Sequence, residues 1–345
     1  MSLFLAFEFT NAQSDQELLI EDMLLIADNF AAPGAEAAAI QSSAGWFSSA
    51  KYLGKWKVEI SVHGNAVFVP GSKQTKLAAN NDFSILNIRG SSNALLPTVF
   101  GGDTDVVFEG ELNDPGLTFD FTFDAIDGLN KDVIIHPFPQ VTVGLPYGTE
   151  VALRYVPRVP INDVGVSTSG IGLKHNFAQY FKYSRPEDFQ MAAVLTYSNI
   201  NIDYAYEPIQ INASGINVLE LNRIDVEADL WLLQALASKL YGNFEVFGAV
   251  GVTNSNFDYS MGGGGSLLPD LNRELVALGG SETKIKGDLG FNYYVGDFKI
   301  STMFTASSFF NANLGLHFKI NKLTFNHSLF LDWFIIRIFV KSIIN

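Results

Sequence analysis

The segment from Trp56 to Phe68 alternates without a break between two kinds of side chain. Its even positions are apolar or small: Trp56, Val58, Ile60, Val62, Gly64, Ala66 and Phe68. Its odd positions begin with polar or charged residues: Lys57, Glu59, Ser61, His63 and Asn65. Twelve steps of about 3.3 Å give roughly 40 Å of strand, which covers roughly 28 Å of height at a tilt of about 45°. The pattern therefore predicts a strand that crosses a membrane, with its even face toward lipid.

Similar alternation recurs along the chain after Lys51. The longer examples are segments 189–198, 223–232, 284–295 and 313–320, and the shorter ones are 138–143, 151–155, 244–252 and 298–304. At about 20 to 25 residues for each strand and its loop, this region predicts roughly 12 to 14 strands, with an even number favoured by closure. The sequence thus predicts an all-β fold, a transmembrane antiparallel β-barrel.

Composition supports this fold class over the alternatives. Only 17% of residues are charged, against about 25% in typical globular chains, yet no uninterrupted apolar run of about 18 residues suggests a spanning helix. A soluble β-sandwich or lipocalin-like carrier also alternates, but long strands with aromatic ends favour a membrane barrel. The net charge of −14 disfavours a nucleic-acid partner, and the absence of cysteine excludes a disulfide scaffold.

The ends of the chain predict separate segments. Residues 1–12 contain a short apolar run before small residues, which indicates the residual part of an export signal. Residues 13–51 open with a capping box at Ser14 and Glu17 and continue as an amphipathic helix that we expect to stop before Pro33, forming a helical plug. Residues 52–320 are assigned to the barrel. The remainder, 321–345, is predicted to be an atypical extension, because its apolar run is too short and too charged to span as a helix.

Four phrases carry a family resemblance: Gly45-Trp46-Phe47-Ser48-Ser49-Ala50-Lys51, Leu96-Pro97-Thr98-Val99-Phe100-Gly101-Gly102, Gly144-Leu145-Pro146-Tyr147-Gly148-Thr149 and Gly170-Ile171-Gly172-Leu173-Lys174-His175. Together they resemble an uncharacterised family of outer-membrane β-barrel proteins from Bacteroidota, distantly similar to the long-chain fatty acid transporter barrels. The resemblance implies an outer-membrane location and a barrel with an N-terminal plug. The transporters' Asn-Pro-Ala plug motif has no match here, where the nearest text is Ala32-Pro33-Gly34-Ala35.

The polar faces of the strands predict which side chains line the lumen. We expect seven there: Lys57, Glu59, His63, Arg223, Asp225, Glu227 and Asp229. The alternate residues of the same strands, such as Ile224 and Leu230, should then contact lipid. Aromatic residues predicted to lie on a ligand path or in the plug are Phe30, Trp46, Phe47, Trp231 and Phe247, although each could equally pack the plug against the wall.

No pattern for catalysis or metal binding emerges. The five histidines lack metal-ligand spacing, no Gly-x-Ser-x-Gly elbow occurs, and Gly262–Gly265 is expected to be a flexible loop tip. The acidic stretch Gly101–Gln140 is expected to be an external loop. We therefore predict no cofactor, no metal and no enzymatic activity.

The predicted function is porin-like passive uptake or binding of small hydrophobic molecules in contact with outer-membrane lipid. The alternatives are a structural or interaction barrel that serves an envelope assembly, and a secreted soluble lipid-binding β-protein. The ligand and the oligomeric state stay open.

Overall fold

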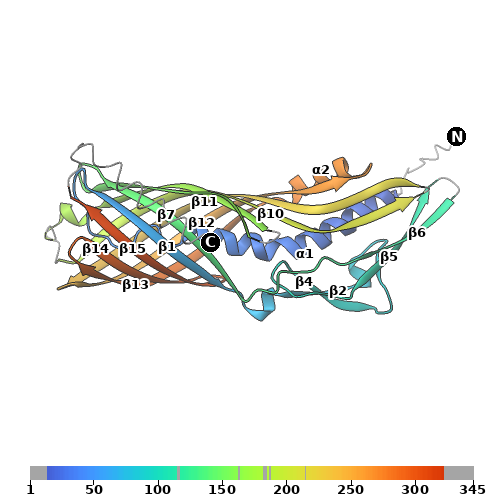
Figure 1. The fold of residues 1–345 in the computed structure, drawn as a ribbon, viewed down its shortest axis with the longest axis horizontal. Coiled ribbons are helices and arrows are strands. Elements are labelled where there is room, and N and C mark those ends of the chain that lie inside the picture. The colour runs from blue at the N-terminus through green and yellow to red at the C-terminus, as the bar shows by residue number, and fades with distance from the viewer. Residues whose placement is uncertain are drawn as a thin grey trace, which may run out of the picture.

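A computed structural model describes residues 14–321, apart from 115–116, 162–163, 182–184, 186–187 and 214. The predicted signal segment and residues 322–345 of the predicted extension lie outside the described residues. Ten antiparallel strands close into a barrel in the order β1-β15-β14-β13-β12-β11-β10-β9-β8-β7 (Figure 1). Their bounds are β1 Val58–Phe68, β7 Val133–Gly144, β8 Thr149–Ile161, β9 Val164–Asn176, β10 Gln190–Ala213, β11 Ile216–Tyr241, β12 Phe244–Gly264, β13 Ser281–Val295, β14 Phe298–Ala306 and β15 Phe310–Ile320.

The barrel class is confirmed, but the predicted count of roughly 12 to 14 strands is wrong. Strands β10, β11 and β12 contain 24, 26 and 21 residues, so each alone takes up the length that the estimate allotted to a strand and its loop together. In addition, the chain between Phe68 and Val133 leaves the barrel.

Short connections at residues 145–148, 242–243 and 296–297 mark one end of the barrel, here called the turn end.

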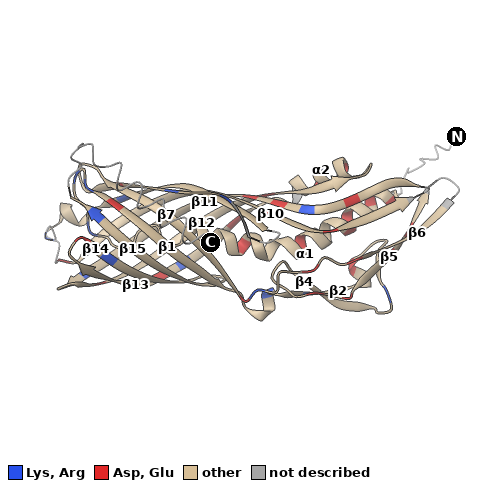
Figure 2. Cartoon of the chain, viewed as in Figure 1, with Lys and Arg blue, Asp and Glu red and all other residues tan. Residues whose placement is uncertain are grey.

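At the other end, three strands run on past the barrel and form what we call the extension. Pairing of β9 with β10 stops at Tyr204, and pairing of β12 with β13 stops at Asn256. Beyond these points β10, β11 and β12 continue as a three-stranded sheet. From Leu230 to Ile216, fourteen steps of about 3.3 Å give roughly 46 Å of strand. Figure 2 shows that acidic residues recur along this region and along the helix beside it.

Smaller elements pack around the extension. They are η1 Gly71–Lys73, β2 Thr75–Ala79, η2 Asn80–Asp82, β3 Asn87–Ile88, β4 Asn93–Pro97, β5 Val107–Asp114, β6 Leu117–Asp124 and α2 Leu268–Leu278, while η3 Ala178–Tyr180 lies in the connection before β10. Most of the acidic stretch 101–140 lies here, outside the barrel, but its last residues form part of β7. Gly262–Gly264 is not a loop tip, because these glycines pair with β11 in β12.

Helix α1 (Asp15–Ser43) runs along the extension sheet and ends inside the barrel (Figure 1). The capping box is present: Glu17 N donates to Ser14 Oγ over 3.3 Å, and Ser14 N donates to the Glu17 carboxylate over 3.2 Å. The helix does not stop before Pro33, which lies within it. Proline costs about 3 kcal/mol there, but the alanine-rich turns that follow favour helix and are buried on all sides, which offsets the loss. None of the helices among the described residues is long and apolar enough to cross a membrane.

The outward face of the barrel strands carries a continuous apolar belt. On β11, Trp231, Leu233 and Tyr241 are 51%, 63% and 60% exposed. Ten steps from Trp231 to Tyr241 give roughly 33 Å of strand, or roughly 23 Å of height at a 45° tilt, close to the apolar band of an outer-membrane barrel. Aromatic residues also stand toward both ends of β15, at Phe310 and Phe318. The structure is therefore a transmembrane barrel whose belt matches a bilayer core.

Candidate functional site

Four of the residues predicted to line the lumen do not lie there. Arg223 and Asp225 form an ion pair on the outside of the extension, with side chains 52% and 33% exposed. Glu227 is also exposed, and Asp229 accepts hydrogen bonds from Tyr197 and Asn199 on the same outer face. The prediction was wrong because this part of β11 lies beyond the membrane. Water there covers the outer face and α1 covers the inner one.

The apolar residues that alternate with those four on β11 were predicted to contact lipid, and this prediction was wrong for the same reason. Ile224, Val226, Ala228 and Leu230 are buried in the core beneath α1 and do not contact lipid. Trp231, predicted for a ligand path, points outward at the edge of the apolar belt, where its ring lies 5.0 Å from that of Tyr197.

The other predicted site residues divide between two places. Trp46, Phe47 and Phe247 are 2%, 6% and 1% exposed and share one apolar cluster within the barrel. Glu59 and His63 also face the lumen, and Lys57 lies just before β1 at the turn end. Phe30, in contrast, packs in the extension, where its ring stacks on Tyr204 at 5.6 Å.

The lumen is occupied by the chain itself. Residues 41–53, here called the lumen segment, comprise the end of α1 and the irregular stretch that continues toward the turn end. Side chains from the barrel wall donate hydrogen bonds to many of its backbone carbonyls. The accepting residues are Gln41, Ser42, Ser43, Ala44, Trp46, Ser48, Ser49, Ala50 and Lys51. The segment is thus fixed along its length.

Two wall cations serve the end of α1. Arg154 of β8 donates to Ser42 O at 3.2 Å and to Ala44 O at 3.1 Å. Lys286 of β13 donates to Ser43 O at 2.9 Å and forms an ion pair with Asp288 at 3.2 Å. The last carbonyls of a helix lack partners within the helix and carry partial negative charge, so buried cations stabilise this helix end.

Arg154 also joins the lumen segment to the wall through its guanidinium face. That group lies 4.1 Å from the centroid of the Trp46 ring and 3.7 Å from that of Phe138 on β7. It donates a further hydrogen bond to Gln140 Oε1 at 3.1 Å. One side chain therefore links β7, β8, α1 and the indole, in a site from which water is excluded.

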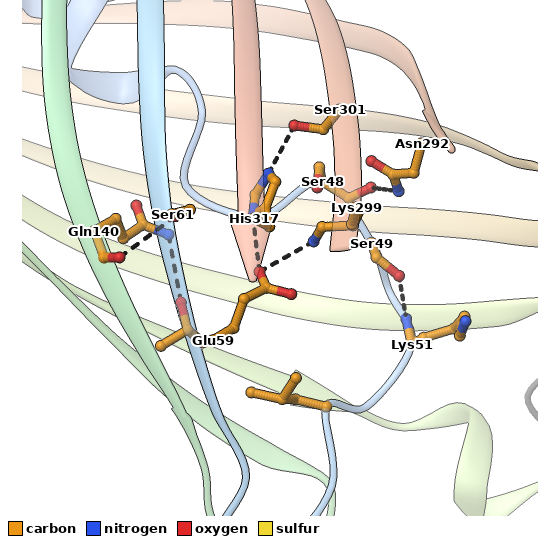
Figure 3. A network of polar contacts seen from close by, with 12 residues as sticks. Ser48, Ser49, Lys51, Glu59, Ser61, Gln140, Asn292, Lys299, Ser301 and His317 are labelled. Carbon is orange, nitrogen blue, oxygen red and sulfur yellow. Dashed lines mark hydrogen bonds and ion pairs between the residues drawn. The ribbon is translucent and has the colours of Figure 1, made fainter. Parts of the chain in front are cut away.

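A relay of polar groups crosses the adjoining wall (Figure 3). Ser301 Oγ lies 2.8 Å from His317 Nε2, and His317 Nδ1 lies 2.8 Å from a Glu59 carboxylate oxygen. This is the connectivity of a nucleophile, a base and an orienting acid. However, Ser301 is only 2% exposed and does not border the nearby cavity, while Glu59 is shared with Lys299 at 3.1 Å. The relay thus serves as a buried lumen network in this structure.

A cavity of about 80 Å³ opens beside this relay at the turn end, and we call it the turn-mouth cavity. It is lined by Trp46, Phe47, Ser48, Ser49, Lys51, Tyr52, Leu53, Glu59, Thr142, Glu150, Lys174, Tyr294, Lys299, His317 and Lys319. A second hollow, between α1, α2 and the extension sheet, measures only about 10 Å³. That is the space for a single water, so it does not hold an apolar ligand.

The barrel wall is incomplete between β7 and β8. These strands pair only from Gln140–Arg154 to Gly144–Glu150, whereas β7 pairs with β1 along its whole length as far as Val133. Residues 133–139 of β7 and 155–161 of β8 are therefore not paired with each other. We call this unpaired stretch the seam.

Prolines explain why pairing stops at the seam. Gly144 N donates to Lys57 O, and Val69 N donates to Asp132 O, so even-numbered residues of β7 direct their backbone groups to β1. Odd-numbered residues, including Pro137 and Pro139, face β8 and offer no N–H. On β8, Pro157 lies at a bulge where the register with β9 shifts.

The part of the seam next to the paired residues carries exposed apolar side chains, whereas Arg158, farther along β8, lies outside the membrane. Ile135 on β7 and Tyr155 on β8 are both 66% exposed, while Phe138, directed inward, is 1% exposed and contacts Arg154. Unpaired backbone groups in hydrocarbon cost several kcal/mol each. The barrel therefore tolerates a costly discontinuity at a place that joins the bilayer to the lumen segment.

Outside the membrane, the extension is closed by polar contacts with α1 and between strands. The buried Asp22 carboxylate accepts from the backbone N–H groups of Ser84, Ile85 and Leu86 at 2.7 to 2.9 Å. On the surface, hydrogen bonds from the Arg158 guanidinium hold the pKa of the Asp203 carboxyl below its usual value. The Asp22 contacts fix the N-terminal half of α1 and its covering loop, and the Arg158–Asp203 pair joins β8 to β10.

Sequence reasoning missed several residues that the structure brings together in the lumen. Arg154 and Lys174 are nearly fully buried, but the alternation around Arg154 is short and none was predicted around Lys174, whereas Lys286 stands on the polar face of the predicted segment 284–295. One signal was available: a basic residue within an otherwise apolar strand, as in Val151-Ala152-Leu153-Arg154, implies a buried partner. The paired prolines of β7 were a second signal, since proline within a strand favours an edge.

Comparison with known proteins gives a family but no activity. The profile described as "Family of unknown function (DUF6588)" matches residues 1–320. No curated protein matches the chain. Similar solved structures include the β-domain of the Bordetella autotransporter BrkA, with 8% identity, a TM-score of 0.35, and coverage of 76% of this chain and 99% of that one. The translocator domain of NalP from Neisseria meningitidis has 7% identity, a TM-score of 0.30, and coverage of 88% and 99%. The outer-membrane protease OmpT from Escherichia coli has 8% identity, a TM-score of 0.28, and coverage of 76% and 96%. These likenesses are too distant to carry an argument about activity.

Proposed function

Because the chain belongs to DUF6588, a family of unknown function, we propose its role from its own geometry: an outer-membrane barrel that admits small hydrophobic molecules from the bilayer through the seam between β7 and β8. The seam is the observation that carries this proposal. A hydrophobic solute dissolves in the membrane core, so a route that begins at the lipid-facing wall spares it a passage through water.

The seam is the place where the wall opens with the smallest loss of backbone hydrogen bonds. Across the neighbouring interfaces, β1 pairs with β7 and β8 pairs with β9 over almost their full lengths. Separating those strands would break many backbone hydrogen bonds in a medium without water. At the seam, β7 and β8 have no such hydrogen bonds to break. A solute entering there meets Phe138, Arg154 and Trp46.

The lumen segment closes the route inward in the observed state. Passage to the turn end requires the hydrogen bonds of Arg154, Lys174 and Asn292 to residues 42–51 to be released or exchanged. The barrel is therefore a gated conduit and not an open pore. Short turns of bacterial barrels face the periplasm, so the turn end is the proposed exit and the extension points outside the cell.

Closing the seam tests the proposal directly. Replacing both prolines, Pro137→Val with Pro139→Val, restores two N–H donors on the edge of β7 that faces β8. We expect at least a fivefold slower entry of a hydrophobic fluorescent dye into cells that carry the barrel in their outer membrane. A cysteine pair, Pro139→Cys with Tyr155→Cys, joined by a short thiol-reactive linker, should have the same effect, and the chain has no other cysteine to interfere.

The matched control is a cysteine pair below the seam. Val141 and Leu153 face each other where β7 and β8 are still paired, so linking Val141→Cys to Leu153→Cys should leave dye entry unchanged. Unchanged dye entry in the seam-linked protein, with the cross-link confirmed on a gel, would contradict the proposal.

The extension favours a second candidate function. Its β11 runs for roughly 46 Å from Leu230 to Ile216, and the extension carries α1, β5–β6 and α2 on an extensive apolar core. A rigid arm of this kind suits an interaction barrel that serves an envelope assembly. Recovery of a stable partner after detergent extraction, lost when residues of the extension surface are changed, would favour this role over uptake.

A further inference from the structure

The turn-mouth cavity carries an excess of positive charge that the transport route does not use. Four lysines line it, Lys51, Lys174, Lys299 and Lys319, against two carboxylates, Glu59 and Glu150. The lining therefore carries two more lysines than carboxylates (4 − 2 = 2), with His317 counted as neutral. The whole chain has a net charge of −14, so this local excess runs opposite to the composition.

Two of the lysines are already paired. Lys174 Nζ lies 3.0 Å from Glu150 and also donates to the carbonyls of Ser49 and Lys51. Lys299 Nζ lies 3.1 Å from Glu59, as Figure 3 shows. These contacts leave no ammonium proton of Lys174 free for a ligand.

The other two have no carboxylate within 4 Å in the part of the chain that the structure describes. Lys51 Nζ lies 4.5 Å from the centroid of the Tyr294 ring. The nearby Glu245 carboxylate is engaged by Ser49, Asn292 and Tyr294 through hydrogen bonds. Lys319 is half-buried at the mouth. Both lysines thus line the cavity without an ion pair among the described residues.

We propose that the turn-mouth cavity binds a small phosphate-type oxyanion through Lys51 and Lys319. Lysine ammonium groups serve as point charges for phosphate, and a concave site with low-dielectric walls strengthens their field. The volume of about 80 Å³ is several times what one water needs, which leaves room for a small oxyanion. The Thr142 hydroxyl, which also borders the cavity, adds a neutral donor.

This chemistry fits either free inorganic phosphate or the phosphate of a lipid headgroup at the membrane surface. Calorimetric titration of the full-length protein in a non-ionic detergent separates them. One arm uses inorganic phosphate, and the other uses a short-chain phosphatidic acid in the same micelles. Binding in both arms with similar affinity assigns the site to the phosphate group, and at least tenfold tighter binding of the lipid assigns it to a headgroup.

The double variant Lys51→Gln with Lys319→Gln should weaken binding at least tenfold in whichever arm is positive. The matched control is Lys239→Gln on β11, an exposed lysine over the ring of Tyr241 at 5.7 Å, which should bind as the unchanged protein does. Heat-modifiable gel migration verifies that each variant is a folded barrel. Absence of binding in both arms, or equal binding by the double variant, overturns the proposal. Because the seam plays no part in this test, its outcome is independent of the route for hydrophobic solutes.

Discussion

The two halves of β11 contain the same alternation but face opposite surroundings. In the barrel half, odd residues such as Trp231 and Leu233 are apolar and exposed, and the even residues Gln234 and Ser238 are polar and buried. In the extension half, odd residues are charged and lie outside, whereas even residues are apolar and lie against α1.

The strand does not change its orientation between the halves. Even residues point inward from Ile224 to Ser238. The outward face changes from charged to apolar near Trp231, while the inward face keeps the buried Leu232 and Leu236 and adds the polar Gln234 and Ser238. On β12, the outward-facing side chains change from apolar at Val252 to polar at Asn254, and Asn254 pairs with Trp231. The change therefore marks the edge of the bilayer: an outward face must suit lipid on one side of this line and water on the other.

We expect the largest loss of stability when a charge is placed on the inner face of the extension. Ile224→Asp should destabilise the extension by more than about 4 kcal/mol, because it removes a buried apolar side chain and buries an unpaired carboxylate. Limited proteolysis should then cleave α1 while heat-modifiable migration shows an intact barrel. Asp225→Asn on the outer face is the control. Resistance of the Ile224 variant to protease would mean that the inner face is wet.

The next effect comes from two arginines on β8, one buried in the lumen and one exposed. Arg154→Met should cost about 2 to 4 kcal/mol, since it leaves buried carbonyls of the lumen segment unpaired. We also expect a larger ion conductance in planar bilayers as the segment loosens. Arg158→Met, on the exposed part of β8, should leave the conductance unchanged and cost much less stability, because it breaks only an exposed ion pair. Equal behaviour of the two variants would show that the lumen segment does not depend on its wall contacts.

A smaller loss is expected at Asp22, where α1 holds the loop that covers the extension. Asp22→Ala should lower the free energy of unfolding by about 1 to 3 kcal/mol, because three backbone N–H groups lose their acceptor. Hydrogen exchange at residues 84–86 would report it. The control, Asp28→Asn, changes an exposed carboxylate of the same helix. If exchange at 84–86 stays slow in the Ala variant, water or another group replaces the carboxylate.

The smallest effect is a pH dependence at the exposed ion pair between Arg158 on β8 and Asp203 on β10. Since Arg158 lowers the pKa of Asp203 in the folded protein, the pair contributes stability above the unfolded pKa of about 3.9 and loses it as pH falls through the lower folded value. The unfolding midpoint of Asp203→Asn should therefore lie slightly below that of the unchanged protein at pH 7 and converge with it below about pH 3. A difference that persists at pH 2 would assign the effect to packing.

Much of the barrel was predictable because alternation is a local property of a strand. Segment 56–68 predicted β1, and Glu59 and His63 were correctly placed on its inner face. The same rule misplaced Arg223, Asp225, Glu227 and Asp229, since alternation reports two different faces without saying which surroundings each one meets. The count of strands failed for a related reason: no local signal distinguishes a strand that ends at the bilayer from one that runs on.

The lumen contacts required the folded chain. Arg154 and Ser42 are 112 residues apart in sequence, and Lys286 and Ser43 are 243 apart, so no local pattern predicts these pairs.

By itself, the sequence determined a membrane barrel of alternating strands, a capped N-terminal helix and a wall weakened by prolines, because periodicity, capping and a missing N–H act within a few residues. Only the tertiary structure decided where the bilayer ends, which cations hold the lumen segment and which lysines are left without a partner. Those properties depend on what closure of the barrel brings face to face, and on whether lipid, water or protein lies against each side chain.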